Sequence, residues 1–240
     1  MDLFATLSII FQLILLEGLL SIDNAAVLAA LTFHLPDHAE PPKPLNHPIA
    51  KKLFGVDQRS SALKAGILGA YIGRGIMLLL ASIIIKNPLL KVIGAGYLIY
   101  LTLSHFLKKD GQKNAKSHGD GFWQTVLAIE LADLAFSLDN IVAAVSLSDR
   151  LWVVAIGVFI GIAVMRFGAT YIMHLMEREP VLAHGAYLVI FVIAVELLVR
   201  EFFQIETPYL LKFLLSIGIL VGTVAVTRLA NKRQKTAIRK

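Results

Sequence analysis

Long apolar stretches follow one another along most of the chain. Each is about 20 residues long, the length that a helix needs to cross the ~30 Å hydrocarbon core of a bilayer. Hydrophobic residues make up 57% of the 240 residues and charged residues only 17%, against roughly 25% charged residues in a soluble domain. The sequence contains no cysteine, which excludes disulfides and cysteine metal sites. These features argue against an ordinary soluble enzyme and predict a polytopic membrane protein.

The apolar stretches predict an all-α membrane helix bundle with seven transmembrane helices. We expect the spans at Leu3–Leu31, Ala62–Ile85, Leu89–Leu107, Phe122–Leu147, Leu151–Leu175, Val181–Val199 and Pro208–Arg228. An apolar run at the N-terminus is too long for a signal peptide, so we interpret it as a retained helix.

A four-residue polar motif occurs twice, in the first and the fourth predicted span. Ser21-Ile22-Asp23-Asn24 recurs as Ser137-Leu138-Asp139-Asn140, and Glu17 aligns with Asp133 at the same offset of 116 residues. A unit of three spans is odd in number, so its second copy must insert in the opposite orientation. Many secondary transporters have this plan, with the substrate site near the midplane between the two repeats.

Paired glycines mark the second and fifth spans. Gly69-x3-Gly73 aligns with Gly157-x3-Gly161, and small residues at this spacing favour close packing of helices. We interpret them first as packing positions. Arg74 and Arg166 lie nearby in the same two spans and could neutralise two of the buried acids.

The repeat defines the expected domain organisation. We expect a first three-helix repeat at 1–107 with a cytoplasmic loop at 36–60, a linker at 108–121, a second, inverted repeat at 122–200, a seventh helix at 201–228 and a basic cytoplasmic tail at 229–240. With the tail inside, 16 of the 23 lysines and arginines lie on the cytoplasmic side and five on the other. This bias predicts an N-terminus outside and a C-terminus in the cytoplasm.

Six acids fall inside the predicted spans: Glu17, Asp23, Glu130, Asp133, Asp139 and Glu196. An ionised carboxylate at the centre of a bilayer costs at least about 2.5–3.5 kcal/mol, so such acids indicate a functional site. Carboxylate, amide and hydroxyl oxygens suit hard divalent cations such as Mn²⁺, Ca²⁺ and Mg²⁺. On a helix, Asp23 and Asp139 point about 100° away from the neighbouring asparagines. Either the helices loosen at the motif or these aspartates face the opposite repeat.

The stretches Leu16–Ala30 (LEGLLSIDNAAVLAA) and Ile129–Asp149 (IELADLAFSLDNIVAAVSLSD) resemble the twin signature of the TerC family of bacterial and plastid integral membrane proteins. The resemblance covers both three-span halves and implies export of manganese or a related divalent cation. In some members the family supplies metal to proteins outside the membrane. Glu196 departs from the family pattern, because many relatives have a basic residue there. The loop at Pro36–Ser60 resembles an insertion.

The ligand positions that the resemblance implies are Asp23, Asn24, Asp139 and Asn140, with Glu17 and Asp133 nearby.

We therefore expect a secondary transporter that exports divalent cations, above all Mn²⁺, by alternating access. Mn²⁺ is then the transported ion, and no other cofactor is expected. One alternative is a non-transporting membrane scaffold in a metal or tellurite stress response, whose acidic core only fixes helix register. A further one, ranked last, is an exporter of small cationic organic solutes.

We expect no enzymatic activity and no nucleic-acid partner. The expected partners are divalent cations, the lipid bilayer, and other membrane proteins or further copies of the chain. The expected location is the inner (plasma) membrane of a bacterium, as a multi-pass protein.

Overall fold

A computed structural model describes residues 3–36, 39–107, 120–148, 150–205 and 207–238. Within these ranges, only the backbone is described at residues 5, 16, 18–23, 120, 139, 209 and 231–238. The described part of the chain is helical and contains no strand. Its helices are α1 (Leu3–Thr32), α2 (Pro48–Phe54), α3 (Gln58–Leu79), α4 (Ala81–Lys86), α5 (Pro88–Leu107), α6 (Asp120–Leu147), α7 (Leu151–Arg178), α8 (Val181–Phe203) and α9 (Tyr209–Ile238).

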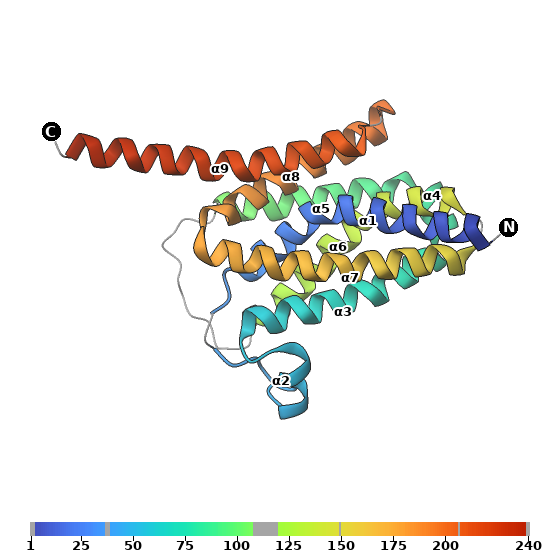
Figure 1. The fold of residues 1–240 in the computed structure, drawn as a ribbon, viewed down its shortest axis with the longest axis horizontal. Helices are drawn as coiled ribbons and strands as arrows, with labels where there is room; N and C mark the ends of the chain where they lie inside the picture. Colours follow the sequence, from blue (N-terminus) through green and yellow to red (C-terminus); the bar gives the residue numbers. More distant parts are fainter. Residues whose placement is uncertain (1–2, 37–38, 108–119, 149, 206, 239–240) are drawn as a thin grey trace.

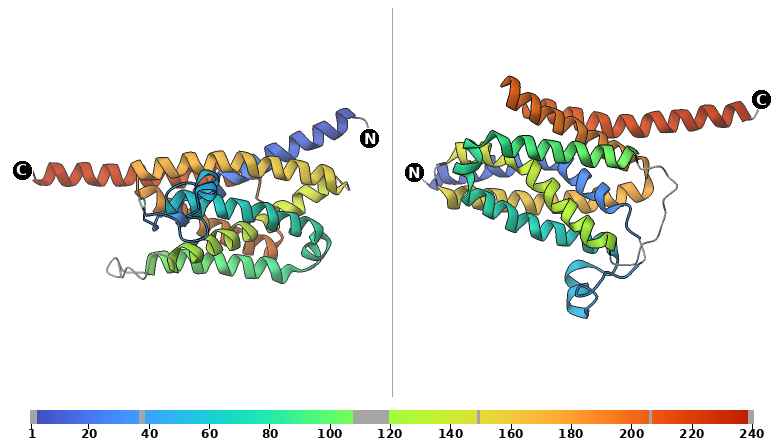
Figure 2. Two further views of the ribbon diagram at one scale, coloured as in Figure 1. Left: turned by 90° about the horizontal axis from the view of Figure 1, so that it is seen from below. Right: turned by 180° about the vertical axis from the view of Figure 1, so that it is seen from behind.

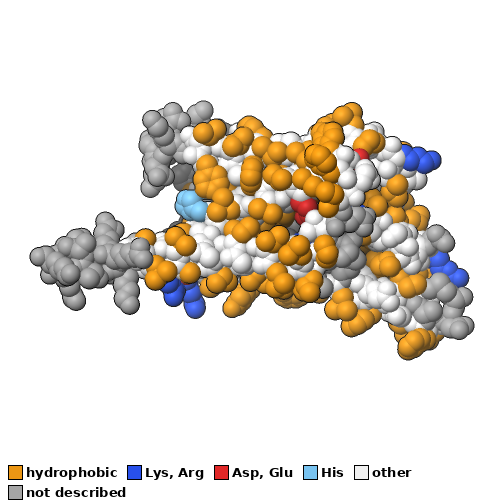
Figure 3. Space-filling view, turned by 90° about the horizontal axis from the view of Figure 1, so that it is seen from above, with side chains coloured by type: hydrophobic (Ala, Val, Ile, Leu, Met, Phe, Trp, Pro, Cys, Tyr) orange, Lys and Arg blue, Asp and Glu red, His pale blue; other side chains and the backbone are white. Residues whose placement is uncertain are grey.

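Within the described residues, six helices are long and apolar enough to cross a membrane: α3, α5, α6, α7, α8 and α9. The remaining long helix, α1, has 30 residues, and its described part includes the apolar stretch Thr6–Leu15. The helices lie side by side in an elongated bundle (Figure 1). Hydrophobic side chains are spread over the face seen in Figure 3, while lysine and arginine side chains lie away from its centre. The helical content, the six long apolar helices and this apolar surface together confirm an all-α membrane bundle.

The two motif-bearing helices run in opposite directions. Residues just after α1 meet the start of α6: His34 Nε2 lies 3.0 Å from Thr125 Oγ1, and Leu35 packs in one apolar cluster with Phe122. The most extensive contacts between the predicted halves pair α1 with α7, α3 with α6 and α5 with α8. This reciprocal pairing is consistent with the predicted inverted repeat.

The paired glycines lie where helices from the two halves come closest. A Cβ atom at Gly157 of α7 would collide with the side chain of Leu13 on α1, and one at Gly69 of α3 would collide with the carboxylate of Glu130 on α6. A Cβ at Gly73 would lie only 3.0 Å from Leu134. The interpretation of the glycine pairs as close packing positions is confirmed.

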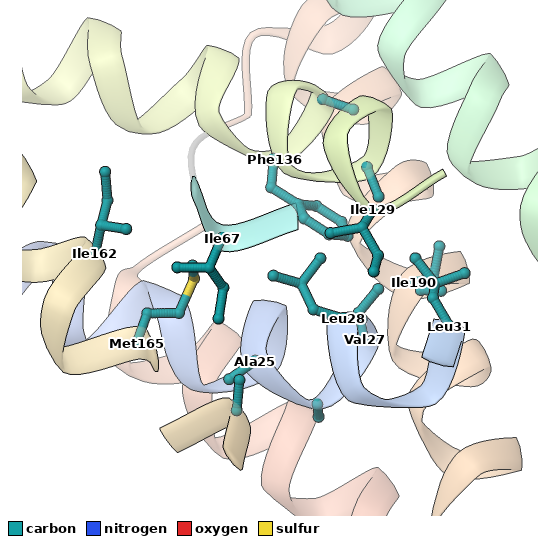
Figure 4. Close-up of a cluster of buried hydrophobic side chains, with 14 of the residues drawn as sticks. Ala25, Val27, Leu28, Leu31, Ile67, Ile129, Phe136, Ile162, Met165 and Ile190 are labelled. Carbon is teal, nitrogen blue, oxygen red and sulfur yellow. The ribbon is translucent and has the colours of Figure 1, made fainter. Parts of the chain in front are cut away.

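The apolar core lies between α1, α3, α6, α7 and α8. Figure 4 shows Leu28 of α1, Ile67 of α3 and Phe136 of α6 directed toward one another, and all three side chains are at most 4% exposed. In contrast, α9 lies along the outside of the bundle and projects past it (Figure 2). Only 6% of the apolar stretch within its residues Leu210–Ala230 is buried inside the bundle.

The structure differs from the predicted spans at three places. The second span is interrupted at Leu80, which separates α3 from α4. The loop at 36–60 contains a short helix, α2, which begins with a proline at its first position, where the missing N–H is not needed. Finally, α9 continues as helix to Ile238, through most of the predicted basic tail. The motif helices α1 and α6 are continuous, so the expected alternative of a loosened helix at the motif is wrong for the backbone.

The long loop is fastened to the end of the bundle by Arg59. Its Nε and Nη2 donate to the carbonyl oxygens of Leu35 and Phe33, each at 2.7 Å, and its guanidinium lies 4.5 Å from the centre of the Phe33 ring. Arg59 thereby satisfies carbonyls that follow the C-terminus of α1. Within the loop, a hydrogen bond from Lys51 lowers the pKa of Glu40.

We expect Gly157→Ala to destabilise the protein by about 1–3 kcal/mol, because the added methyl group has to displace Leu13 in a tightly packed contact. Gly96→Ala on α5 is the matched control, since nothing lies within 4 Å of its added Cβ. This control should be neutral or stabilising by up to about 1 kcal/mol. Thermal unfolding of both variants in detergent tests this, and equal melting temperatures would contradict the close α1–α7 contact.

Candidate functional site

A single arginine side chain is buried at the centre of the bundle, where three helices meet. Arg74 of α3 is 1% exposed. Its Nη2 donates to Asp133 Oδ1 at 2.7 Å and its Nε to Asp133 Oδ2 at 3.1 Å, a two-pronged contact with a carboxylate on α6. Such paired, charge-assisted hydrogen bonds are among the strongest in proteins.

The same guanidinium also contacts an acid on α1. Arg74 Nη1 forms an ion pair with Glu17 Oε1, and the Glu17 side chain is 2% exposed. Gly161 of α7 packs against the same acid: a Cβ there would occupy the place of the Glu17 methylene groups. The bridge Glu17–Arg74–Asp133 therefore joins α1 and α3 of the first half to α6 of the second.

Other polar side chains of the two motifs, which follow Glu17 and Asp133 along the chain, are also buried. Ser137 is fully buried, and its hydroxyl donates to Asp133 Oδ2 at 3.4 Å. Asn24 and Asn140 are 2% and 7% exposed. The Nδ2 of Asn140 has no hydrogen-bond partner among the described residues, which is costly for a buried donor.

The predicted ligand set is thus only partly accounted for. Glu17 and Asp133 are brought together by Arg74, and Asn24 and Asn140 are buried in the same two helices. The side chains of Asp23 and Asp139 lie outside the described residues. Among the side chains that are described, no three of the types His, Cys, Asp and Glu come together in a group that could hold a metal ion.

The sequence indicated that Arg74 and Arg166 could neutralise two acids, but it could not assign partners. Arg74 neutralises acids from two helices. Arg166 lies exposed on α7 and forms no ion pair with any described acid. The sequence signal, an arginine inside an apolar span, is the same for both residues, so it could not distinguish the buried Arg74 from the exposed Arg166.

The two other acids in the spans take different places. Glu196 on α8 pairs with Lys212 on α9 at 2.5 Å, so this residue attaches the outer helix to the bundle. Glu130 on α6 is half-buried and lies against α3, where a Cβ at Gly69 would collide with its carboxylate. No ion pair of Glu130 is formed with the residues that the structure describes.

Comparison with known proteins places the chain among bacterial membrane proteins. The family described as "Integral membrane protein TerC family" matches residues 48–236. The uncharacterized membrane protein YceF of Bacillus subtilis (strain 168) is 35% identical over 236 residues, which cover 94% of this chain and 84% of YceF. YkoY, an uncharacterized membrane protein of the same strain, is 32% identical over 209 residues, 79% of this chain and 59% of YkoY.

A third relative comes from another bacterium. The UPF0053 inner membrane protein YgdQ of Escherichia coli (strain K12) is 30% identical over 215 residues, which cover 82% of this chain and 81% of YgdQ. No solved structure matches the chain.

We expect Asp133→Asn to destabilise the protein by about 3–5 kcal/mol, because it removes the two-pronged partner of a buried guanidinium. Glu201→Gln is the matched control, since Glu201 pairs with Lys91 at 2.9 Å near the end of α8, away from this bridge. The control should cost clearly less. Thermal unfolding in detergent compares the two variants, and an equal loss for both would show that the Arg74 contact is not specially important for stability.

Proposed function

Since the chain belongs to the TerC family of integral membrane proteins, we propose that it is a secondary transporter that exports divalent cations, with Mn²⁺ as the main substrate. The ion binds near the midplane between the two repeats, which then rock to expose the site to either side. The proposed ligand residues are Asp23, Asn24, Asp139 and Asn140, with Glu17 and Asp133 nearby.

The observation that carries this proposal is the buried bridge Glu17–Arg74–Asp133. Two acids and an arginine at the centre of an apolar bundle are expensive to place there, and membrane proteins keep such groups mainly along ion and substrate pathways. The bridge lies between the halves, which is where a transporter of this plan binds its substrate. About two helical turns further along α1 and α6 lie the buried motif asparagines.

The chemistry of the proposed ligands supports a hard cation. Carboxylates and amide carbonyls supply oxygen atoms, which bind Mn²⁺, Mg²⁺ and Ca²⁺ in preference to soft ions. Several carboxylates also repel an anionic substrate. The chain is proposed to act in transport and not as an enzyme.

The proposed topology follows from the distribution of basic residues. In this topology the positively charged loops and tail lie in the cytoplasm with the C-terminus, and the N-terminus lies outside. The loop with α2 and the far end of α9 lie at the same end of the bundle, as this topology requires (Figure 1). The inner membrane of a bacterium is the proposed location, with other membrane proteins or further copies of the chain as partners.

A non-transporting scaffold is the second candidate, and one observation favours it. Arg74 already engages both Glu17 and Asp133, so the three groups satisfy one another without an added cation. A bridge of this kind would suffice to fix the register of α1, α3 and α6. The two candidates differ in one respect: the transporter moves metal ions across the membrane, and the scaffold does not.

We expect cells that produce the protein to hold less total manganese under excess Mn²⁺ than cells without it, because export removes the ion. The double variant Asp23→Asn/Asp139→Asn, produced at an equal membrane level, should lose this effect, since it lacks the charge that binds the ion. Total cellular manganese measured by mass spectrometry provides the readout.

Glu201→Gln serves as the control, because it removes one acid at the end of α8 and leaves both motifs intact. It should lower manganese as the unmodified protein does. Equal manganese with and without the protein would favour the scaffold. If the double variant lowers manganese as well as the unmodified protein, export stands but the proposed ligands are wrong.

A further inference from the structure

Arg74 takes up carboxylate oxygens of Glu17 and Asp133, the two acids that lie beside the four other proposed ligands. Both oxygens of Asp133 accept from the same guanidinium, through Nε and Nη2, and the third nitrogen, Nη1, faces Glu17. All three side chains are at most 2% exposed. The acids of this centre are therefore neutralised by a cation that is part of the chain.

A guanidinium and a divalent cation cannot share these acids. A metal ion bound to Asp133 or Glu17 would lie within a few ångströms of the guanidinium, and two like charges repel strongly in a medium of low dielectric constant. Binding of the metal to these oxygens thus requires Arg74 to leave them. The two cations are alternatives for the same acids.

The bridge also crosses the boundary that a transporter of this plan has to move. Arg74 and Glu17 belong to the first half, and Asp133 belongs to the second. Alternating access moves one half against the other around the site. An unloaded carrier that carried bare acids through this movement would bear the full cost of buried, unpaired charge.

The α3 backbone on either side of Arg74 has a low helix propensity, because glycines flank it at positions 73 and 75. A Cβ at Gly75 would meet only Phe159, at 3.7 Å, and glycine inside a helix weakens it relative to alanine. Beyond the acids, Nη2 lies 3.9 Å from the sulfur of Met165 on α7, a weak acceptor and the only other partner of this nitrogen among the described residues.

We infer that Arg74 is an internal counter-ion: its guanidinium occupies the cation position between Glu17 and Asp133 in the unloaded carrier, and the divalent cation displaces it. This inference rests on the proposed function. Arg74 neutralises Glu17 and Asp133 while the empty carrier returns, and the metal ion neutralises them in the loaded carrier.

Two transport modes in proteoliposomes separate these tasks. Net uptake of radioactive Mn²⁺ into metal-free vesicles requires the empty carrier to return, whereas exchange of radioactive for unlabelled Mn²⁺, saturating on both sides, does not. For Arg74→Gln we expect net transport to fall by about tenfold, the effect of 1.36 kcal/mol on a barrier. Exchange should continue near the rate of the unmodified protein. Arg166→Gln removes an exposed arginine of α7 and should retain both modes.

Each other outcome has a definite meaning. If Arg74→Gln folds but loses both modes, Arg74 is structural; if it keeps both, the residue has no part in the return step. Either result overturns the inference about Arg74 but not the proposed transport function, because the unmodified protein still transports Mn²⁺. If the unmodified protein shows neither mode, the proposed function itself fails.

Arg74→Lys gives a second test that does not depend on recovering the glutamine variant. Lysine keeps the charge but lacks the planar fork that holds both oxygens of Asp133. As a weaker competitor, it should let Mn²⁺ bind about tenfold more tightly, the effect of one charge-assisted hydrogen bond. Isothermal titration of the purified protein with Mn²⁺ measures this, and unchanged or weaker affinity would contradict the displacement.

Discussion

The structure depends on one arrangement of charge: an arginine that is 1% exposed, held between carboxylates from two other helices. In an apolar bundle each of these groups alone would be prohibitively costly, and together they are mutually satisfied. In this structure the three contacts therefore fix the relative register of α1, α3 and α6. Packing elsewhere in the bundle has to be compatible with that register.

Close helix packing makes this register possible. In each half a glycine-bearing helix lies against the motif helix of the other half, α3 against α6 and α7 against α1. The glycines remove the side chains that would hold the helices apart. At Gly161 and Gly69 the neighbouring side chain is itself an acid, Glu17 or Glu130. The same positions that bring the halves together therefore also shape the surroundings of the buried carboxylates.

Much of the fold follows from local sequence properties, and much of the site does not. Apolar length predicted the helices, and the spacing of small residues predicted where they pack. In contrast, nothing local predicts the interruption at Leu80, since Leu78, Leu79 and Ala81 are all good helix residues. The pairing of Arg74 with two acids, 57 and 59 residues away along the chain in opposite directions, is set by tertiary packing alone. Glu196 departs from the family pattern in its charge. Its pairing with Lys212 could not be predicted, because the sequence does not show which helix α9 packs against.

The outer helix α9 is attached to the bundle mainly through α8. Lys212 pairs with Glu196, Arg228 with Glu179, and Thr223 packs against Gly185, all three on or next to α8. Between these points most of its surface faces outward and is apolar. Lipid requires only that this surface remain hydrophobic, so one aliphatic residue serves there as well as another. Random mutation should thus accumulate fastest along the outward face of α9, and slowest where α1, α3, α6 and α7 share a glycine contact.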